Sequence, residues 1–308
     1  MKFVAVDWGS SSFRAWLLGN AGEIIASVET PQGVLSHEGT GFEQTLEQAC
    51  GDWLKEESHL PVIMAGMVGS RNGWLETQYK TCPLKAIDLA DQLQAVDNQR
   101  GWNLFIVPGV CSLGATLGVN NAADVMRGEE VQMFGALSNH QQDSSLVCLP
   151  GTHSKWAQSQ GESLQSFSTF FTGEMFSLLK EKSSIGAVLS DNNPDPQAFV
   201  EGLQFSRQPG GFLNHIFSVR ARPLTNTWSG GSLAAYLSGI AIGHEFVGAM
   251  TLFPEQRQLS ILGKPELQSL YQLAAEEFGF ESSTIDAADA FIKGINIIAN
   301  KVINEHSE

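Results

Sequence analysis

Apolar and polar residues follow two periods along this chain, one typical of strands and one typical of helices. Alternating runs rich in β-branched residues predict strands at 2–7, 12–18, 23–29, 61–65, 104–107, 145–149 and 259–262. Apolar residues three and four positions apart predict helices at 42–56, 128–138, 172–180, 195–203, 231–249, 265–278 and 287–303. Because the two kinds of element mix throughout, the pattern predicts an α/β protein.

One local pattern occurs twice, about half a chain apart. Near residue 4 a strand leads through a glycine and three serines into the strand-like "FRAWLL". Near residue 146 the strand "LVCLP" leads through "GTHSK" into "WAQS". Each copy reads as strand, small-residue turn, strand. Two domains that begin with the same hairpin would produce this repeat.

We therefore expect two domains, residues 1–116 and 117–308, since a single core rarely grows beyond ~250–300 residues. The boundary is placed in the Gly-, Ala- and Asn-rich segment 110–125. The last helix, 287–303, is a candidate to pack back against the first domain.

Composition and charge narrow the range of partners. Of the 308 residues, 43% are hydrophobic and 17% are charged, as in a globular protein with a sizeable core. The net charge of -15 argues against non-specific binding to nucleic acid or to an anionic membrane. It does not exclude an anionic substrate, because a few arginines can form a local positive pocket.

The chain also lacks the usual signs of a membrane or secreted protein. No uninterrupted apolar run reaches the ~18 residues of a membrane span, and the first residues read as a strand and not as a signal peptide. The cysteines show no CxxC or zinc-type spacing, so we expect reduced thiols in a cytoplasmic protein. They are Cys50, Cys82, Cys111 and Cys148.

The first hairpin combines an acid with a turn of small residues. Such a turn exposes N–H groups and hydroxyls that can hold phosphate oxygens, and Asp7 at the strand end can hold Mg²⁺. By itself the pattern fits a plain hairpin with an incidental acid equally well. Arg14 lies among apolar neighbours in the next strand, where its charge needs a partner such as phosphate. The turn residues are Gly9, Ser10, Ser11 and Ser12.

The second turn favours the phosphate interpretation of the first. It offers a glycine, two hydroxyls and a cation, and two such turns indicate a nucleotide held in a cleft between two domains. A glycine turn on a late strand, at Gly263, is a candidate third wall against the adenosine. Taken alone, Lys155 would more often be a solvated turn lysine. The second turn consists of Gly151, Thr152, His153, Ser154 and Lys155.

Six stretches in order along the chain resemble the 2-dehydro-3-deoxygalactonokinases. They are "VDWGSSSFRAWLL", "AGMVGSRNGWLETQY", "DVMRGEEVQMFGAL", "LPGTHSKWA", "FSTFFTGEMFSLL" and "YLSGIAIGHE". The resemblance covers nearly the whole chain. It implies the two-domain actin/hexokinase/Hsp70-like fold and a reaction in galactonate catabolism. In that reaction ATP, with Mg²⁺, phosphorylates the C6 hydroxyl of 2-dehydro-3-deoxy-D-galactonate.

The implied reaction needs a base for the attacking hydroxyl, and a carboxylate is the usual one. Glu129 and Glu130 are the candidates, because related sugar kinases place an acid after a glycine at a helix N-terminus in this region. Those kinases usually use aspartate, and the spacing to the following Phe-Gly does not align cleanly. The residues alone leave open which glutamate is the base, and whether the pair only complements the helix dipole.

The substrate carboxylate calls for arginine, a natural bidentate partner. Arg71 lies in the glycine-rich loop "GSRNGW", with Gly69 and Ser70, and Arg127 lies beside the two glutamates. Trp74 is a candidate to pack on the sugar acid or, equally, in the core. A further candidate contact is Thr172, which the sequence supports only as the N-cap of a helix.

The residues are also compatible with two other functions. One is a non-catalytic module that senses a sugar acid or a nucleotide, and the other is a phosphatase on the same fold. The kinase interpretation also leaves open the epimeric 2-dehydro-3-deoxy-gluconate as substrate, because epimer choice depends on one or two hydrogen-bonding groups. The sequence does not decide whether the protein is a homodimer.

Overall fold

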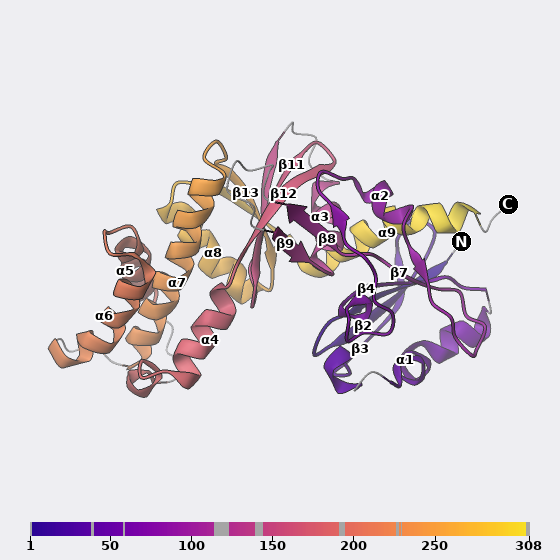
Figure 1. The fold of residues 1–308 in the computed structure, drawn as a ribbon, viewed down its shortest axis with the longest axis horizontal. Coiled ribbons are helices and arrows are strands. Elements are labelled where there is room, and N and C mark those ends of the chain that lie inside the picture. The colour runs from indigo at the N-terminus through magenta and orange to yellow at the C-terminus, as the bar shows by residue number, and fades with distance from the viewer. Residues whose placement is uncertain are drawn as a thin grey trace. The chain divides into compact units, whose positions relative to one another are not determined.

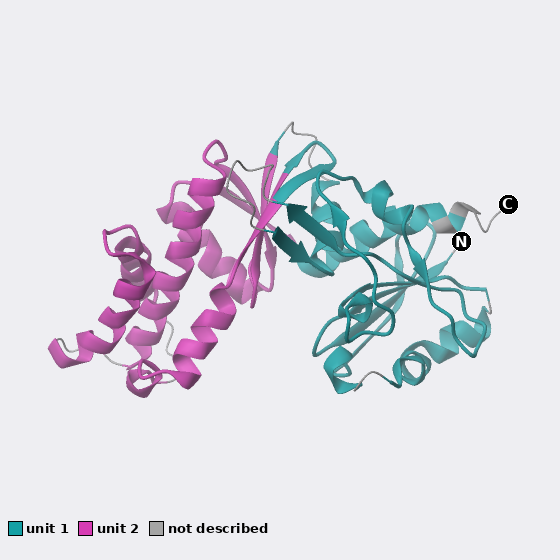
Figure 2. Cartoon of the chain, in the orientation of Figure 1, with its two compact units in different colours: residues 1–144, 159–166, 287–308 teal, residues 145–158, 167–286 magenta. Residues whose placement is uncertain are grey.

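The computed structural model describes residues 2–37, 40–57, 59–113, 123–138, 144–190, 195–225, 228 and 230–305. Strands and helices mix along the whole described chain, which confirms the predicted α/β class (Figure 1). The chain divides into two compact units (Figure 2). The first comprises residues 1–144, 159–166 and 287–308, and the second comprises residues 145–158 and 167–286.

The main sheet of the first unit has the strand order β3-β2-β1-β4-β7-β6. The first hairpin is antiparallel, whereas β4 and β7 run parallel to β1. These parallel strands end at one edge, where Trp8 pairs with Gly66. The strands are β1 (Phe3–Trp8), β2 (Phe13–Leu18), β3 (Ile24–Thr30), β4 (Val62–Gly66), β6 (Gln94–Ala95) and β7 (Leu104–Ile106).

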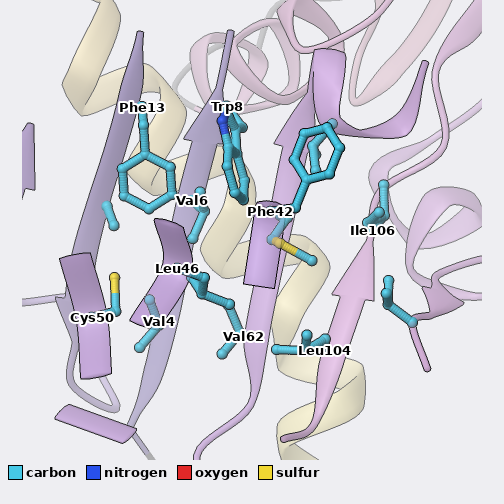
Figure 3. Packing of buried hydrophobic residues seen from close by; sticks show 14 of the residues in the cluster. Val4, Val6, Trp8, Phe13, Phe42, Leu46, Cys50, Val62, Leu104 and Ile106 are labelled. Atoms are coloured by element: carbon cyan, nitrogen blue, oxygen red, sulfur yellow. The ribbon is translucent and has the colours of Figure 1, made fainter. Parts of the chain in front are cut away.

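The two faces of this sheet bury different residues of β1. Val4, Val6 and Trp8 lie in a core with helix α1 (Phe42–Glu56), as Figure 3 shows. Alternation places Asp7 on the opposite face, where Trp16 of β2 packs against Phe291 of α9 (Ala287–Glu305) at 5.3 Å between ring centroids. Asp7 therefore lies on a face that helices cover, and not in the apolar core beside α1.

A small three-stranded sheet and two further helices complete the first unit. The sheet has the order β5-β8-β9, with β8 and β9 antiparallel. Its strands are β5 (Lys80–Thr81), β8 (Val110–Leu113) and β9 (Ala123–Met126), and the helices are α2 (Ala86–Ala90) and α3 (Glu129–Leu137). Short 3-10 turns lie at Val34–Ser36 and Met67–Gly69.

The sheet of the second unit has the order β12-β11-β10-β13-β14, which repeats the β3-β2-β1-β4-β7 part of the first sheet; residues 159–166 of its β11–β12 hairpin belong to the first unit. Strands β10, β13 and β14 are parallel, like β1, β4 and β7. The strands are β10 (Ser145–Leu149), β11 (Ser154–Gln160), β12 (Ser163–Phe170), β13 (Gln258–Gly263) and β14 (Glu281–Asp286). The helices are α4 (Thr172–Lys182), α5 (Pro196–Ser206), α6 (Gly211–Thr225), α7 (Gly230–Leu252) and α8 (Pro265–Glu277), with a 3-10 turn at Gly186–Val188.

Helix α7 is long and apolar enough, by length and composition, to cross a membrane. Most of its apolar window is buried inside the protein, and the core helix of a soluble protein passes the same test. Leu233, Leu237 and Ile240 pack in a core with residues of α5 and α6. We therefore interpret α7 as a core helix.

The compact units are bounded differently from the domains expected from the sequence. Helix α3 belongs to the first unit although it follows residue 116, and so does α9. Glycines allow these helices to touch: a Cβ on Gly135 would overlap the Ala290 carbonyl oxygen, and one on Gly294 would overlap that of Val131. The segment 110–125 contains β8 and the start of β9, with 114–122 outside the described residues.

Several elements were not predicted, each for a local reason. Helix α6 contains Pro223, and proline is disfavoured inside a helix. Strand β14 is at the edge of its sheet and is partly exposed, so its sequence "ESSTID" lacks an apolar face. Thr172 is the first residue of α4 and not its N-cap, which is Phe171 and makes no side-chain capping bond.

Candidate active site

Asp7 and Arg14 face each other across the first hairpin. They are paired in the strand register, and Arg14 Nη2 donates to Asp7 Oδ2 at 2.5 Å. Burial raises the pKa of Asp7, while the Arg14 guanidinium opposes that increase. Arg14 Nε is buried and makes no hydrogen bond within the described chain. The partner that the Arg14 charge required is therefore, at least in part, Asp7.

The turn after β1 is held from one side by a neighbouring loop. Gly9 N donates to Ser12 O at 2.9 Å, while Gly9 O and Ser10 O accept bonds from Val34 N and Leu35 N at 2.9 and 3.0 Å. A Cβ on Gly33 would overlap the Ser10 carbonyl, so this close approach requires glycine. The N–H groups of Ser10 and Ser11 have no bonds to the described residues, as a phosphate cradle requires.

Helix α3 begins beside this turn and carries the two glutamates. Its N-cap, Gly128, has φ 103°, and a Cβ there would lie 3.1 Å from Gly66 Cα at the end of β4. Glu129 Oε2 accepts from Arg127 N at 3.0 Å, and Glu130 Oε2 accepts from Gly128 N at 2.6 Å. The negative charge of Glu129 also raises the pKa of Asp7. The fold therefore brings Asp7, Arg14 and the glutamate pair together.

The two glutamates differ in burial. Glu129 is half-buried, whereas Glu130 is 0% exposed and its Oε1 has no partner among the described residues. Burial, followed by the charge of Glu129, raises the pKa of Glu130 to about 8. A substrate hydroxyl can reach a half-buried carboxylate more readily than a fully enclosed one.

Asp7 is the carboxylate at the end of β1 that could hold Mg²⁺. The described residues contain no group of three or more His, Cys, Asp or Glu side chains that could hold a metal ion. Mg²⁺ bound with a nucleotide usually needs only one or two carboxylates, because phosphates and water supply its other ligands. Asp7 Oδ1 makes no hydrogen bond in the described chain, so a single-carboxylate Mg²⁺ site fits these residues.

The loop that follows β4 is held by Arg127. The Arg127 Nη1 atom donates to Thr77 Oγ1 and Nη2 donates to Thr77 O at 2.8 Å, and the guanidinium lies 4.4 Å from the centre of the Tyr79 ring. Thr77 N in turn donates to Gly69 O at 3.0 Å. A Cβ on Gly69 would lie 2.9 Å from Arg127 Nη1. Arg127 thus holds the loop, and its guanidinium is already engaged.

The tip of the same loop presents a different arginine. Arg71 is exposed, and the described residues offer it no hydrogen bond or ion pair. Ser70 Oγ next to it is buried and has no hydrogen-bond partner among the residues that the structure describes. Trp74 stacks on Phe42 at 6.0 Å and meets Trp8 edge-on at 6.4 Å, so one part of its ring belongs to the core.

In the second unit the turn 151–155 packs against the start of α4. Glu174 N donates to Thr152 O at 3.0 Å, and a Cβ on Gly173 would overlap the Gly151 carbonyl oxygen. His153 Nε2 lies 2.6 Å from Glu174 Oε2. Lys155 is buried, and its Nζ donates to His153 O at 3.2 Å, within the turn itself. The fold thus brings the turn and Thr172 together.

Sequence reasoning missed Glu245, which lies beneath this turn. It is 2% exposed and accepts bonds from Trp156 Nε1 and Tyr271 Oη, each at 2.7 Å. Burial raises its pKa, and a hydrogen bond from the Thr172 side chain partly opposes the increase. The available signal was a single acid within the long apolar stretch of α7.

A mostly apolar cavity of about 490 Å³ lies elsewhere in the second unit, among α4, α5, α7 and α8. Glu266 and Leu270 of α8 line it, and Phe176 of α4 and Phe199 of α5 face them. Gly263 ends β13 two residues before α8, and a Cβ there would make only an ordinary contact with Pro150. Gly263 does not line the cavity itself but precedes the helix that does.

The chain is similar to known proteins over nearly its whole length. Residues 7–298 match the sequence model of the 2-keto-3-deoxy-galactonokinase family. The 2-dehydro-3-deoxygalactonokinase of Escherichia coli K12 is 33% identical over 303 residues, which is 98% of this chain and 99% of that protein. A Sinorhizobium meliloti crystal structure, described as a candidate for the same enzyme, superposes with a TM-score of 0.90 at 32% identity, covering 97% and 99% of the chains.

A more distant structure shares the fold alone. The activator of 2-hydroxyisocaproyl-CoA dehydratase from Clostridium difficile, solved with ADPNP bound, has a TM-score of 0.53 at 13% identity. The superposition covers 100% of this chain and 97% of the activator. Together with the repeated strand order, these likenesses confirm the two-domain actin-like ATPase fold that the sequence resemblance implied.

Proposed function

Because the chain belongs to the 2-keto-3-deoxy-galactonokinase family, we propose that it transfers the γ-phosphoryl group of ATP to the C6 hydroxyl of 2-keto-3-deoxygalactonate in the cytoplasm. It is a kinase, with an alcohol group as acceptor. The observation that carries the proposal is the family match over residues 7–298, which includes all the candidate site residues.

Glu129 is the base in this proposal. Glu129 is half-buried, and its negative charge raises the pKa of Asp7. It therefore lies near the end of β1, where the turn 9–12 begins. Its Oε2 is held by Arg127 N, which fixes the carboxylate without neutralising it. Glu130, fully enclosed and with its pKa raised to about 8, is a positioning residue at the start of α3.

The phosphate groups are assigned to the two turns. Ser10 and Ser11 have N–H groups with no bond to the described part of the first unit, and residues 151–155 form the corresponding turn in the second. Asp7 would hold Mg²⁺, whose charge offsets that of the phosphates when the ion is bound. Arg14 keeps the Asp7 carboxylate oriented through its hydrogen bond to Oδ2.

The sugar acid is assigned to the loop after β4. Arg71 has no partner in the described chain and can form a bidentate pair with the substrate carboxylate. Arg127 holds that loop through Thr77 and thereby positions Arg71 relative to Glu129. The exposed part of Trp74 would pack on the carbon chain of the sugar acid.

Adenosine is assigned to the apolar cavity beside α8. A purine ring favours an apolar cavity of this kind with a few polar groups. The cavity of about 490 Å³ has Phe176, Phe199 and Leu270 in its walls, with Asp195 and Glu266 as polar groups.

A coupled assay for ADP tests the proposed reaction. The purified protein is given ATP and Mg²⁺ alone, and then with 2-keto-3-deoxygalactonate, its gluconate epimer or a simple hexose. We expect ADP release that depends on the galactonate derivative, with a phosphate ester at C6 identified by NMR. Hydrolysis of ATP without a sugar acid would indicate a phosphatase, and ligand-induced stabilisation without turnover would indicate a sensor.

A further inference from the structure

Four parts of the second unit converge on the carboxylate of Glu245. Ser154 lies at the phosphate turn, Trp156 follows on β11, Thr172 opens α4, and Tyr271 comes from α8. All four side chains form hydrogen bonds to Glu245, directly or through another member of the group. These are the elements assigned above to the phosphates and adenosine of the nucleotide.

The direction of these bonds can be worked out from the available protons. Tyr271 has one hydroxyl proton and donates it to Glu245 Oε2 at 2.7 Å. Tyr271 has no second proton, so in the 3.0 Å bond between Tyr271 Oη and Ser154 Oγ the donor is Ser154, whose single proton is shared between Tyr271 Oη and the Glu245 carboxylate. Ser154 Oγ then accepts from Gly151 N at 3.4 Å. The resulting hydrogen-bond chain runs from Gly151 through Ser154 and Tyr271 to Glu245.

This hydrogen-bond chain fixes the conformation of the turn 151–155. Its Ser154 and Tyr271 members are buried, as is the carboxylate at its end, so water does not compete for their bonds. A buried carboxylate costs free energy unless it is well hydrogen-bonded, and an apolar residue could fill the same space in α7 without that cost. What the carboxylate adds is a fixed direction for every hydroxyl in the chain.

We propose that Glu245 is a positioning residue for nucleotide binding, which acts through Tyr271 and Ser154 on the turn 151–155. The inference rests on the proposed kinase function, because it assigns the turn to phosphate. It predicts that breaking the hydrogen-bond chain at Tyr271 raises the KM for ATP and leaves the KM for the sugar acid unchanged.

Tyr271→Phe is the sharpest test, since it removes one hydroxyl and keeps the ring that packs against Phe246. We expect the KM for ATP to rise by about tenfold, as for the loss of one hydrogen bond to a charged group. The KM for the sugar acid should change by less than about twofold. Ser154→Ala should have a similar effect, and the double variant should be no worse than either single one, because both break the same chain.

Tyr236→Phe is the matched control. Tyr236 is a buried tyrosine of the same unit, and its hydroxyl contacts Ser218 at 3.2 Å and not the turn. We expect it to lower Tm without changing either KM. If Tyr271→Phe lowers Tm but leaves the KM for ATP unchanged, or raises both KM values equally, the proposal is wrong. Absence of turnover in the wild-type protein would instead overturn the proposed function itself.

Discussion

Glu129 and Glu130 are adjacent in sequence but have different surroundings. Helix α3 begins at Glu129, so one carboxylate lies at the open start of the helix and the other is enclosed. Each accepts a backbone N–H from two residues earlier, which orients both side chains toward the helix N-terminus. In the proposed reaction Glu129 therefore exchanges a proton with the substrate, while Glu130 holds the local backbone.

Replacing each glutamate separately tests this division. Glu129→Gln should lower kcat by about 10²- to 10⁴-fold with little change in either KM, because the base acts in the chemical step. Glu130→Gln keeps an acceptor for Gly128 N and should lower kcat by less than about tenfold. Steady-state kinetics measure both. Wild-type turnover in Glu129→Gln would place the base elsewhere.

The raised pKa of Glu130 predicts a pH dependence of stability. Its pKa is about 8 in the folded protein, above its ordinary value of 4.5. The protonated group therefore contributes stability that is fully present below about pH 4.5 and is lost as pH rises through about 8. Glu130→Gln cannot ionise, so its Tm should exceed that of the wild type at pH 9 and approach it at pH 5. Thermal denaturation followed by circular dichroism checks this, and an equal Tm difference at both pH values would contradict it.

Arg71 should determine the affinity for the sugar acid. Arg71→Ala removes the proposed carboxylate partner, so the KM for the sugar acid should rise roughly ten- to a hundredfold while the KM for ATP stays unchanged. Arg100→Ala is a suitable control, because Arg100 also lies in the first unit but pairs with Glu43 and Glu47. An unchanged KM for the sugar acid in Arg71→Ala would assign the carboxylate to another residue.

Among the elements of the second unit, the turn 151–155, to which phosphate is assigned in our proposal, packs against α4. Gly173 lies against the backbone of Gly151 and Thr152, and Glu174 N donates to Thr152 O. Two contacts therefore hold the turn: the hydrogen-bond chain that ends at Glu245, and the packing against the first turn of α4.

Gly173→Ala should push the turn 151–155 away from α4. The added Cβ overlaps backbone atoms, which cannot move as a flexible side chain would, so the turn has to shift. We expect the KM for ATP to rise by about tenfold, on the scale of one lost charged hydrogen bond. Gly51→Ala in α1 is the control, because its Cβ would meet only the side chain of Glu47. Equal KM values for ATP in the two variants would show that the close contact does not matter for nucleotide use.

The strongly patterned elements could be predicted from sequence, and the weakly patterned ones could not. Strands β1, β4 and β10 are buried apolar runs, and helix α1 has a clear apolar face. By contrast, the edge strand β14 is polar, and α6 contains Pro223. The small strands β5 and β6 have only two residues each, too few to show any period.

At the scale of the whole molecule, the last helix of the chain completes the first unit. Phe291 of α9 is 1% exposed and packs on Trp16 of β2, on the sheet face that also carries Asp7 and Arg14. The first unit therefore needs residues from both ends of the sequence.

Phe291→Ala tests this dependence. It should lower the free energy of unfolding of the first unit by about 3–5 kcal/mol, as for other large-to-small changes in a core. Ile297→Ala, on the exposed side of the same helix, should have a much smaller effect. Denaturant unfolding with a probe in each unit measures both. Equal, small effects would mean that α9 does not stabilise the first unit.

The α/β class, the repeated hairpin and the candidate residues could all be predicted from the sequence, because each depends on a local pattern or a short motif. The sequence also led to the family, which the comparisons confirm. Three pairings became visible only in the folded protein: Arg14 with Asp7, Arg127 with Thr77, and the buried Glu245 with Tyr271. The physical reason is that partners and burial depend on which distant segments meet, as α3 meets α9, and no local pattern records that.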